Sequence, residues 1–140
     1  MTAAYYLSLM GHQVTVYEQR PKLGGMLRYG IPDYRLPQEI LDRDIDHILS
    51  AGVRVHTGVS IGRDLTMEDI QKSFDAVYIA IGAHNDKKLG LEGEDSQNVI
   101  SAVELLRGIG EGQVPDFTGK KVCVIGGGNV SMDAPRTALR

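Results

Sequence analysis

A run of glycines placed directly after an apolar stretch constrains this chain more than any other feature. Residues 120–125 end in Val-Cys-Val-Ile, a pattern typical of a buried β-strand, and Gly126-Gly127-Gly128 follow at once. In a Gly-x-Gly-x-x-Ser turn, the first glycine permits the tight bend and the second lets the backbone approach a pyrophosphate, while the small Ser131 lets the next helix pack on the strand. The free N–H groups at the start of such a helix favour anions. The predicted NAD(P)-binding residues are Gly126, Gly127, Gly128, Asn129 and Val130.

The front of the chain has the pattern that follows such a turn. Residues 2–10 predict a helix stopped by Gly11, and residues 14–17 predict a strand that ends at the acidic Glu18. An acidic residue at this place accepts hydrogen bonds from ribose hydroxyls, and the matching glycines lie about 20 residues earlier, which is before Met1. We therefore expect an internal fragment that starts just after one dinucleotide fingerprint and ends inside another. A glycine turn that binds nothing, and a Glu18 that is merely solvated, are the alternatives.

Helices and strands are predicted to alternate between these two segments. Thr66-Met67-Glu68-Asp69 has the form of a capping box, and Ser101 is a second N-cap candidate. This alternation predicts the α/β class, a partial Rossmann-like, three-layer fold with a mostly parallel sheet and two incomplete nucleotide-binding lobes. The predicted helices are 37–51, 67–74 and one that starts after Ser101 and fails around 108–112, and the predicted buried strands are 53–57, 76–81 and 120–125.

Charge and composition exclude several functions. The formal net charge is −3 with both signs interspersed, which argues against nucleic acid and anionic membranes as partners. No apolar run is long enough for a bilayer and no signal-peptide pattern is present, so we expect a soluble, cytoplasmic protein. The single Cys123, in a strand predicted to be buried, rules out an internal disulfide or a redox-active pair. The four histidines lack metal-ligand spacing, so no metal site is predicted, and redox chemistry would need a bound cofactor.

The long irregular stretch from Gln19 to Leu36 carries the most specific motif. Residues 24–37 read Gly-Gly-Met-Leu-Arg-Tyr-Gly-Ile-Pro-Asp-Tyr-Arg-Leu-Pro. On this motif, and over essentially all 140 residues, the chain resembles the glutamate synthase small (beta) subunit family of FAD/NAD(P)-dependent oxidoreductases. Related members are the flavin half of dihydropyrimidine dehydrogenase and the large subunit of the NADH-dependent ferredoxin:NADP oxidoreductase. In that family the motif follows the ribose-binding Glu and lies along the FAD.

The resemblance implies an FAD site. Gly24 and Gly25 would bring backbone N–H groups to a pyrophosphate or a flavin edge, and Arg35 would offset negative charge on reduced flavin or phosphate. An ordinary surface ion pair of Arg35 with Asp33 or Glu39 is the alternative. No side chain is expected to act as a catalytic acid or base. The implied FAD-binding residues are Glu18, Gly24, Gly25, Leu27, Arg35, Val59, Gly82 and Ala83.

The same resemblance implies a domain plan and an activity. Residues 1–88 would be a partial FAD-binding domain, 89–118 a connector, and 119–140 the start of an NAD(P)-binding domain. The parent enzyme would pass hydride from NADPH or NADH to FAD, and electrons onward to iron–sulfur clusters on a partner domain or on the large subunit of a glutamate synthase-like complex. We expect the isolated chain to bind FAD poorly and to be inactive. A fragment of a flavin-free Rossmann dehydrogenase and a non-catalytic interaction module remain alternatives.

One residue departs from the family pattern. Pro135 lies inside the last predicted helix, where it removes a backbone donor and collides with the carbonyl of Ser131. We therefore expect a kink or an early end of this helix. Asp133 and Arg136, which match the family's Met-Asp-x-x-Arg motif, would then lie on a disturbed helix.

Overall fold

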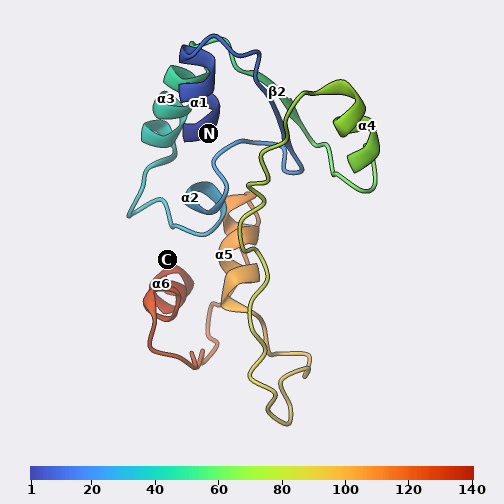
Figure 1. Ribbon diagram of the computed structural model, residues 1–140. Coiled ribbons are helices and arrows are strands. Elements are labelled where there is room, and N and C mark those ends of the chain that lie inside the picture. Colours follow the sequence, from blue (N-terminus) through green and yellow to red (C-terminus); the bar gives the residue numbers. More distant parts are fainter. The chain divides into compact units, whose positions relative to one another are not determined.

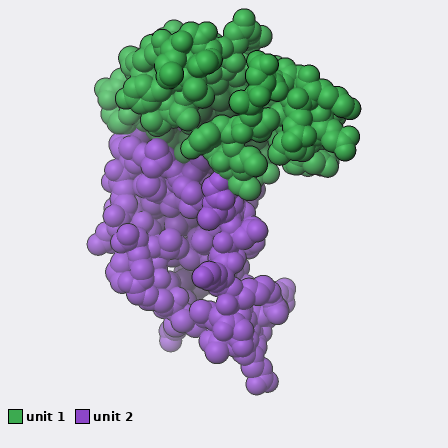
Figure 2. All heavy atoms as spheres, viewed as in Figure 1, with its two compact units in different colours: residues 1–24, 39–81 green, residues 25–38, 82–140 purple.

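The computed structural model describes residues 1–140, which form six helices and two strands (Figure 1). Contacts divide the chain into two compact units, one made of residues 1–24 and 39–81 and the other of residues 25–38 and 82–140 (Figure 2). This division concerns packing alone, so the predicted plan of three segments, with its two boundaries, stays a prediction. The helices are α1 (Thr2–Leu9), α2 (Met26–Tyr29), α3 (Gln38–Leu49), α4 (Met67–Ser73), α5 (Ala102–Gly110) and α6 (Asn129–Ala138), and the strands are β1 (Thr15–Glu18) and β2 (Arg54–Thr57).

The first unit is built on a parallel pair of strands. β1 and β2 run side by side in a register that pairs Thr15 with Arg54 and Glu18 with Thr57. Parallel strands need a crossover connection, and here that connection contains α3 (Figure 1). The Tyr5 hydroxyl lies 3.3 Å from His47 Nε2, which ties α1 to α3. The predicted α/β architecture with a parallel sheet is confirmed. The buried apolar residues of this unit are Ala4, Leu23, Leu41, Ile45, Val53 and Ile70.

Local signals set the helix ends of the first unit as the sequence predicts. At the end of α1, Gly11 has φ +92° and donates to the Ser8 carbonyl, while His12 donates to the Leu7 carbonyl. These two bonds form a Schellman motif, for which glycine suits the left-handed position. At the start of α4, the Thr66 hydroxyl accepts from the Asp69 N–H and the Asp69 carboxylate accepts from the Thr66 N–H, so the predicted capping box is present.

The second unit consists of helices packed on one another. α5 begins at Ser101, whose hydroxyl accepts from the Glu104 N–H as predicted. It packs against α2 at Gly110, where a β-carbon would lie 2.6 Å from the Arg28 carbonyl oxygen, so only glycine allows this approach. α5 also contacts α6. The buried apolar residues of this unit are Tyr29, Leu106 and Ala134.

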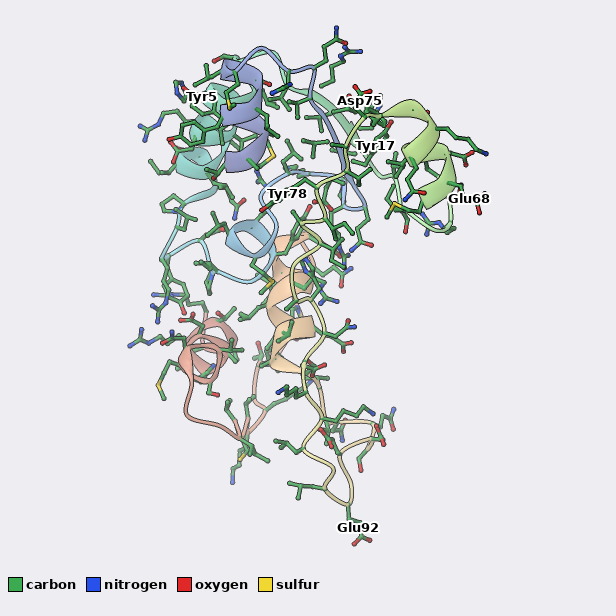
Figure 3. All side chains as sticks on the ribbon, viewed as in Figure 1. Tyr5, Tyr17, Glu68, Asp75, Tyr78 and Glu92 are labelled. Carbon is green, nitrogen blue, oxygen red and sulfur yellow. The ribbon has the colours of Figure 1, made fainter.

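Two of the predicted strands are not formed. Residues 76–81 and 120–125 make no ladder, and most of their apolar side chains are exposed, including Tyr78 at 75% (labelled in Figure 3) and Ile125 at 74%. The prediction of buried strands there is wrong, because an apolar run becomes a strand only when a neighbouring strand pairs with its backbone groups. Cys123 is consequently exposed rather than buried.

Two further expectations are corrected. The stretch from Gln19 to Leu36 is not wholly irregular, since α2 forms one helical turn within it. Of the kink or early end predicted at Pro135, the early end does not occur, since α6 passes through Pro135 and continues to Ala138. Pro135 has no N–H group, so one backbone hydrogen bond of α6 is missing. The hydrogen bonds of the neighbouring residues can still form. None of the helices is long and apolar enough to cross a membrane.

Candidate functional site

The glycine turn before α6 has the conformation that its sequence requires. Gly126 has φ +137°, a conformation that favours glycine, and a β-carbon there would overlap the Ser131 Oγ unless that hydroxyl rotated away. A β-carbon on Gly127 or Gly128 would meet no atom within 4 Å, which leaves open space in front of the turn. Gly128 is the N-cap of α6 and provides no capping side chain. The first N–H groups of a ten-residue helix therefore face an open, exposed cradle, a suitable place for a phosphate group.

In the first unit, Glu18 and Val59 are brought together at the end of the strand pair. The Val59 N–H donates to the Glu18 carbonyl at 3.0 Å, which extends the pairing one step beyond β1 and β2. The Glu18 side chain turns back, and its Oε1 accepts from the Arg20 N–H at 2.8 Å. Two residues that the family resemblance places at the adenosine end of FAD are thus adjacent. The two residues are far apart in the sequence, and the parallel pairing of β1 and β2 is what places Val59 beside Glu18.

The two glycines before α2 adopt conformations closed to most other residues. Gly24 has φ +125° and Gly25 has φ +52°, and a β-carbon on Gly25 would meet nothing within 4 Å. Leu27, on the single turn of α2, is 47% exposed. Gly82 and Ala83 are also exposed, with Gly82 at φ +71°. The backbone at Gly25, Gly82 and Ala83 is therefore accessible, as a close approach to a cofactor would need.

Arg35 has a partner that the sequence did not indicate. Its Nε donates to Asp133 Oδ1 at 2.6 Å, and the Tyr34 hydroxyl donates to the same oxygen at 3.1 Å. The hydrogen bond that Arg35 donates to Asp133, and the negative charge of that carboxylate, raise the pKa of Arg35, so the guanidinium stays charged. Neither Asp33 nor Glu39, the partners considered in the sequence analysis, forms an ion pair with it. In the sequence, only the match to the family's Met-Asp-x-x-Arg motif singled out Asp133, and that match did not indicate Arg35 as its partner.

The second unit also contains an open cleft of about 960 Å³, which includes none of the predicted cofactor residues. Tyr34 and Arg140 contribute to its wall, and the Arg140 guanidinium carbon lies 4.0 Å from the centre of the Tyr34 ring. The rest of the lining comes mainly from residues 114–120, which have no regular secondary structure. We assign no ligand to this cleft, because none of the residues predicted to bind a cofactor lines it.

The parallel βαβ unit and the glycine turn leading into a helix together define a protein of the dinucleotide-binding α/β class. The sequence model of the family described as pyridine nucleotide-disulphide oxidoreductase matches residues 1–139. The chain belongs to this family.

Similar proteins agree with this assignment. The NADP(+)-dependent formate dehydrogenase subunit beta of Moorella thermoacetica is 44% identical over 142 residues, covering 100% of this chain and 20% of that protein. The NADPH-Fe(3+) oxidoreductase subunit beta of Geobacter sulfurreducens is 44% identical over 145 residues, covering 100% and 21%. The glutamate synthase [NADPH] small chain of Mycobacterium tuberculosis is 36% identical over 152 residues, covering 100% and 31%. The predicted relationship to glutamate synthase small chains is confirmed.

A solved structure shows the same fold. Mycobacterium tuberculosis FprA in complex with NADPH matches with a TM-score of 0.79 and 25% identity, over 96% of this chain and 32% of FprA. The chain thus spans between 20% and 32% of the length of these similar proteins. The partial FAD/NAD(P)-binding, Rossmann-like fold predicted from the sequence is confirmed.

Proposed function

We propose that this chain is part of a cytoplasmic oxidoreductase that passes hydride from NADPH or NADH to FAD and electrons onward to iron–sulfur clusters of a partner. The partner would be an iron–sulfur domain or the large subunit of a glutamate synthase-like complex. This proposal rests mainly on the turn before α6, where the backbone conformation of Gly126 favours glycine and the helix N-terminus faces an open cradle. The names of two relatives, an NADPH-Fe(3+) oxidoreductase subunit and a glutamate synthase [NADPH] small chain, support a pyridine nucleotide as donor.

The residues around the turn suit a dinucleotide phosphate. The open space beside Gly127 and Gly128 admits a pyrophosphate, and the N–H groups of Asn129 and Val130 at the start of α6 can donate to it. No acidic residue lies in the first turn of α6 to repel the anion. We propose Gly126, Gly127, Gly128, Asn129 and Val130 as this NAD(P) site.

Two separate segments suit FAD. In the first unit, the adjacent Glu18 and Val59 can hold the ribose and adenine, the former with its carboxylate and the latter with its backbone. In the second, Gly25 leaves its backbone uncovered and Arg35 carries a charge about half-exposed to solvent. When bound, the two dinucleotides supply the redox chemistry, and the chain's residues supply binding, orientation and charge. The full proposed FAD set is Glu18, Gly24, Gly25, Leu27, Arg35, Val59, Gly82 and Ala83.

Nuclear magnetic resonance mapping on the isotopically labelled chain tests both sites even when binding is weak. We expect NADP(H) to shift the amide signals of Gly126–Val130, and FAD at high concentration to shift those of Glu18, Val59 and Gly25. NADPH oxidation by the chain alone is expected to stay at the buffer level. Shifts with NADP(H) but none with FAD would instead favour the flavin-free dehydrogenase. No shift with either nucleotide would favour the non-catalytic module.

A further inference from the structure

α6 holds a carboxyl group that the proposed binding sites do not use. Asp133 is 6% exposed and is one of two buried charged residues, the other being Arg28. A buried carboxyl group is unfavourable unless hydrogen bonds satisfy it. Both bonds that its Oδ1 accepts from side chains come from one short segment, from the Tyr34 hydroxyl at 3.1 Å and from Arg35 Nε at 2.6 Å. The carboxylate therefore holds the segment that follows α2 to α6.

The way in which Arg35 is held leaves part of it available. A guanidinium has five N–H donors in a rigid plane, and the bond to Asp133 uses the one on Nε. The Arg35 side chain is 42% exposed, whereas that of Asp133 is 9% exposed. The terminal nitrogens can therefore donate in parallel to a planar or phosphate oxyanion, the bidentate geometry in which arginine differs from lysine.

We propose that Asp133 is a positioning residue that orients Arg35 so that its terminal nitrogens meet an oxyanion of a bound dinucleotide. The inference rests on the proposed function for its physiological ligand, which is either a pyrophosphate or the anionic ring of reduced flavin. These two share a delocalised negative charge with acceptor oxygens. Because Asp133 lies on the helix opened by the Gly126 turn, one carboxylate links the proposed FAD loop to the proposed NAD(P) helix.

Tyr34 fixes the carboxylate rather than the anion. Its hydroxyl donates to the same Oδ1 that accepts from Arg35, and it lies 3.5 Å from the Asp133 carbonyl. The Arg140 guanidinium over the Tyr34 ring holds the ring by a cation–π contact. Tyr34 thus holds the Asp133 carboxylate, and Arg140 holds Tyr34 in place. Because the carboxylate in turn holds Arg35, the Arg35 side chain loses less conformational entropy when it binds a ligand.

The test follows the side-chain signals of Arg35 in the whole labelled chain by nuclear magnetic resonance. Inorganic pyrophosphate is one probe, and riboflavin reduced by dithionite without oxygen, at mildly alkaline pH, is the other, since it is anionic but has no phosphate. In the native chain we expect a saturable shift of the Arg35 Nε–H and terminal N–H signals with at least one probe. Asp133→Asn keeps an acceptor oxygen but loses the charge that holds Arg35, and it should weaken that response by about fivefold to tenfold, the net contribution of one ordinary hydrogen bond.

Asp86→Asn is the matched control, since it removes the same charge from an exposed position in the same unit and should leave the response unchanged. The proposal is overturned when neither probe moves the Arg35 signals of the native chain, or when Asp133→Asn responds with native affinity. The dispersion of amide signals shows whether Asp133→Asn is folded. If it is not, Arg35→Lys takes its place, because an ammonium lacks the planar pair of terminal nitrogens that donates in parallel, and native affinity in that variant, followed on the neighbouring backbone amide signals, would contradict the proposal.

Failure of the proposed function gives a different pattern. In that case NADP(H) and FAD leave the signals of Gly126–Val130 and of Glu18 and Val59 unmoved, while Arg35 still responds to the small anions in a manner that depends on Asp133. The role of Asp133 as a positioning residue would then stand for an anion other than a dinucleotide.

Discussion

Individual residues in this chain are constrained by backbone conformation more than by their chemistry. Gly126 shows this most directly, since its φ of +137° is strained for any residue with a β-carbon, and the Ser131 Oγ would also have to move aside. Gly127, its neighbour, has no positive φ and open space around it. Two adjacent glycines are therefore constrained differently: the backbone conformation constrains Gly126, whereas nothing in the structure strains a β-carbon at Gly127.

We expect Gly126→Ala to destabilise the chain by about 1 to 3 kcal/mol, the usual cost of forcing a non-glycine residue into such a conformation. Gly127→Ala should change the free energy of unfolding by no more than about 0.5 kcal/mol, as for other open surface positions. Urea unfolding followed by circular dichroism compares the two variants. Equal stabilities would show that the turn does not have the conformation described above.

A second prediction at this scale concerns Asp64. Its carboxylate accepts two bonds from the Arg63 guanidinium, at 3.0 and 2.8 Å, and one from the Ser60 N–H at 2.9 Å. These bonds, that of Arg63 first, lower the pKa of Asp64 to about 2. Because the folded value lies below the ordinary 3.8, the stabilising contribution is complete above that pH and is lost as the pH falls toward 2.

Carbon-detected titration of the Asp64 carboxyl group measures this directly. Arg63→Gln removes the largest cause of the shift, so the pKa of Asp64 should rise toward its ordinary value in that variant. Arg43→Gln, at an exposed arginine elsewhere in the same unit, serves as control and should leave the Asp64 titration where it was. A pKa near 4 in the native chain would contradict the hydrogen bonds of this loop.

At the scale of elements, helices formed where local signals predicted them, and strands formed only where partners exist. The Gly11 stop, the Thr66 capping box and the Ser101 cap each depend on residues within a few positions of one another. Residues 76–81 have an apolar composition as favourable as that of β1, but strand formation depends on a neighbour that can be far away in sequence. Local composition therefore could not separate the formed strands from the unformed ones.

The packing of α2 against α5 yields a test at this scale. A β-carbon on Gly110 would lie 2.6 Å from the Arg28 carbonyl oxygen and 3.1 Å from the Tyr29 Cα, both backbone atoms that cannot turn aside. We expect Gly110→Ala to separate the two helices and to destabilise the second unit by about 1 to 3 kcal/mol. Thermal unfolding and hydrogen exchange of the α2 amides measure the effect.

Gly108→Ala is the matched control on the same helix. Its β-carbon would meet Gln113 Oε1 at 3.2 Å, the end of a flexible side chain that can move away. Replacing glycine by alanine inside a helix stabilises it by roughly 0.5 to 1 kcal/mol, so this variant should be as stable as the native chain or more so. If Gly110→Ala behaved in the same way, the close contact of α2 and α5 would be refuted.

At the scale of the whole molecule, the chain exposes a contiguous run of apolar side chains. Ile79 is 67% exposed and Ile81 is 79% exposed, and both lie on the unpaired segment 76–81 beside Tyr78. Contiguous exposed apolar residues promote association and dye binding, whereas scattered ones do not. The chain covers between 20% and 31% of its curated relatives, so the proposed activity concerns the longer proteins rather than this polypeptide alone.

We expect the native chain to bind the dye anilinonaphthalene sulfonate and to self-associate at high concentration. The double variant Ile79→Thr, Ile81→Thr should bind less dye and associate less, because the apolar run is interrupted. Met10→Thr, at a single residue that is 73% exposed at the end of α1, should leave both unchanged. Fluorescence and analytical ultracentrifugation provide the two measurements. Undiminished dye binding in the double variant would place the apolar surface elsewhere.

Much of the candidate site was predictable because it consists of backbone positions. Gly24, Gly25 and Gly126 are recognisable from the letters alone, since a positive φ angle is what glycine readily provides. Arg35 was recognised as a charged site residue, but its partner was not. Asp133 lies about 100 positions away, and only the folded chain brings the two together.

The sequence by itself determined the family, the helices other than α2, their caps and the glycine turns, because all of these depend on residues close together or on one long motif. Tertiary structure alone decided which apolar segments pair as strands, that Glu18 and Val59 are adjacent, and that Asp133 holds Tyr34 and Arg35. The physical reason is the range of the interaction. A turn or cap is completed within a few residues, whereas a strand pair or a buried ion pair exists only after distant segments have packed.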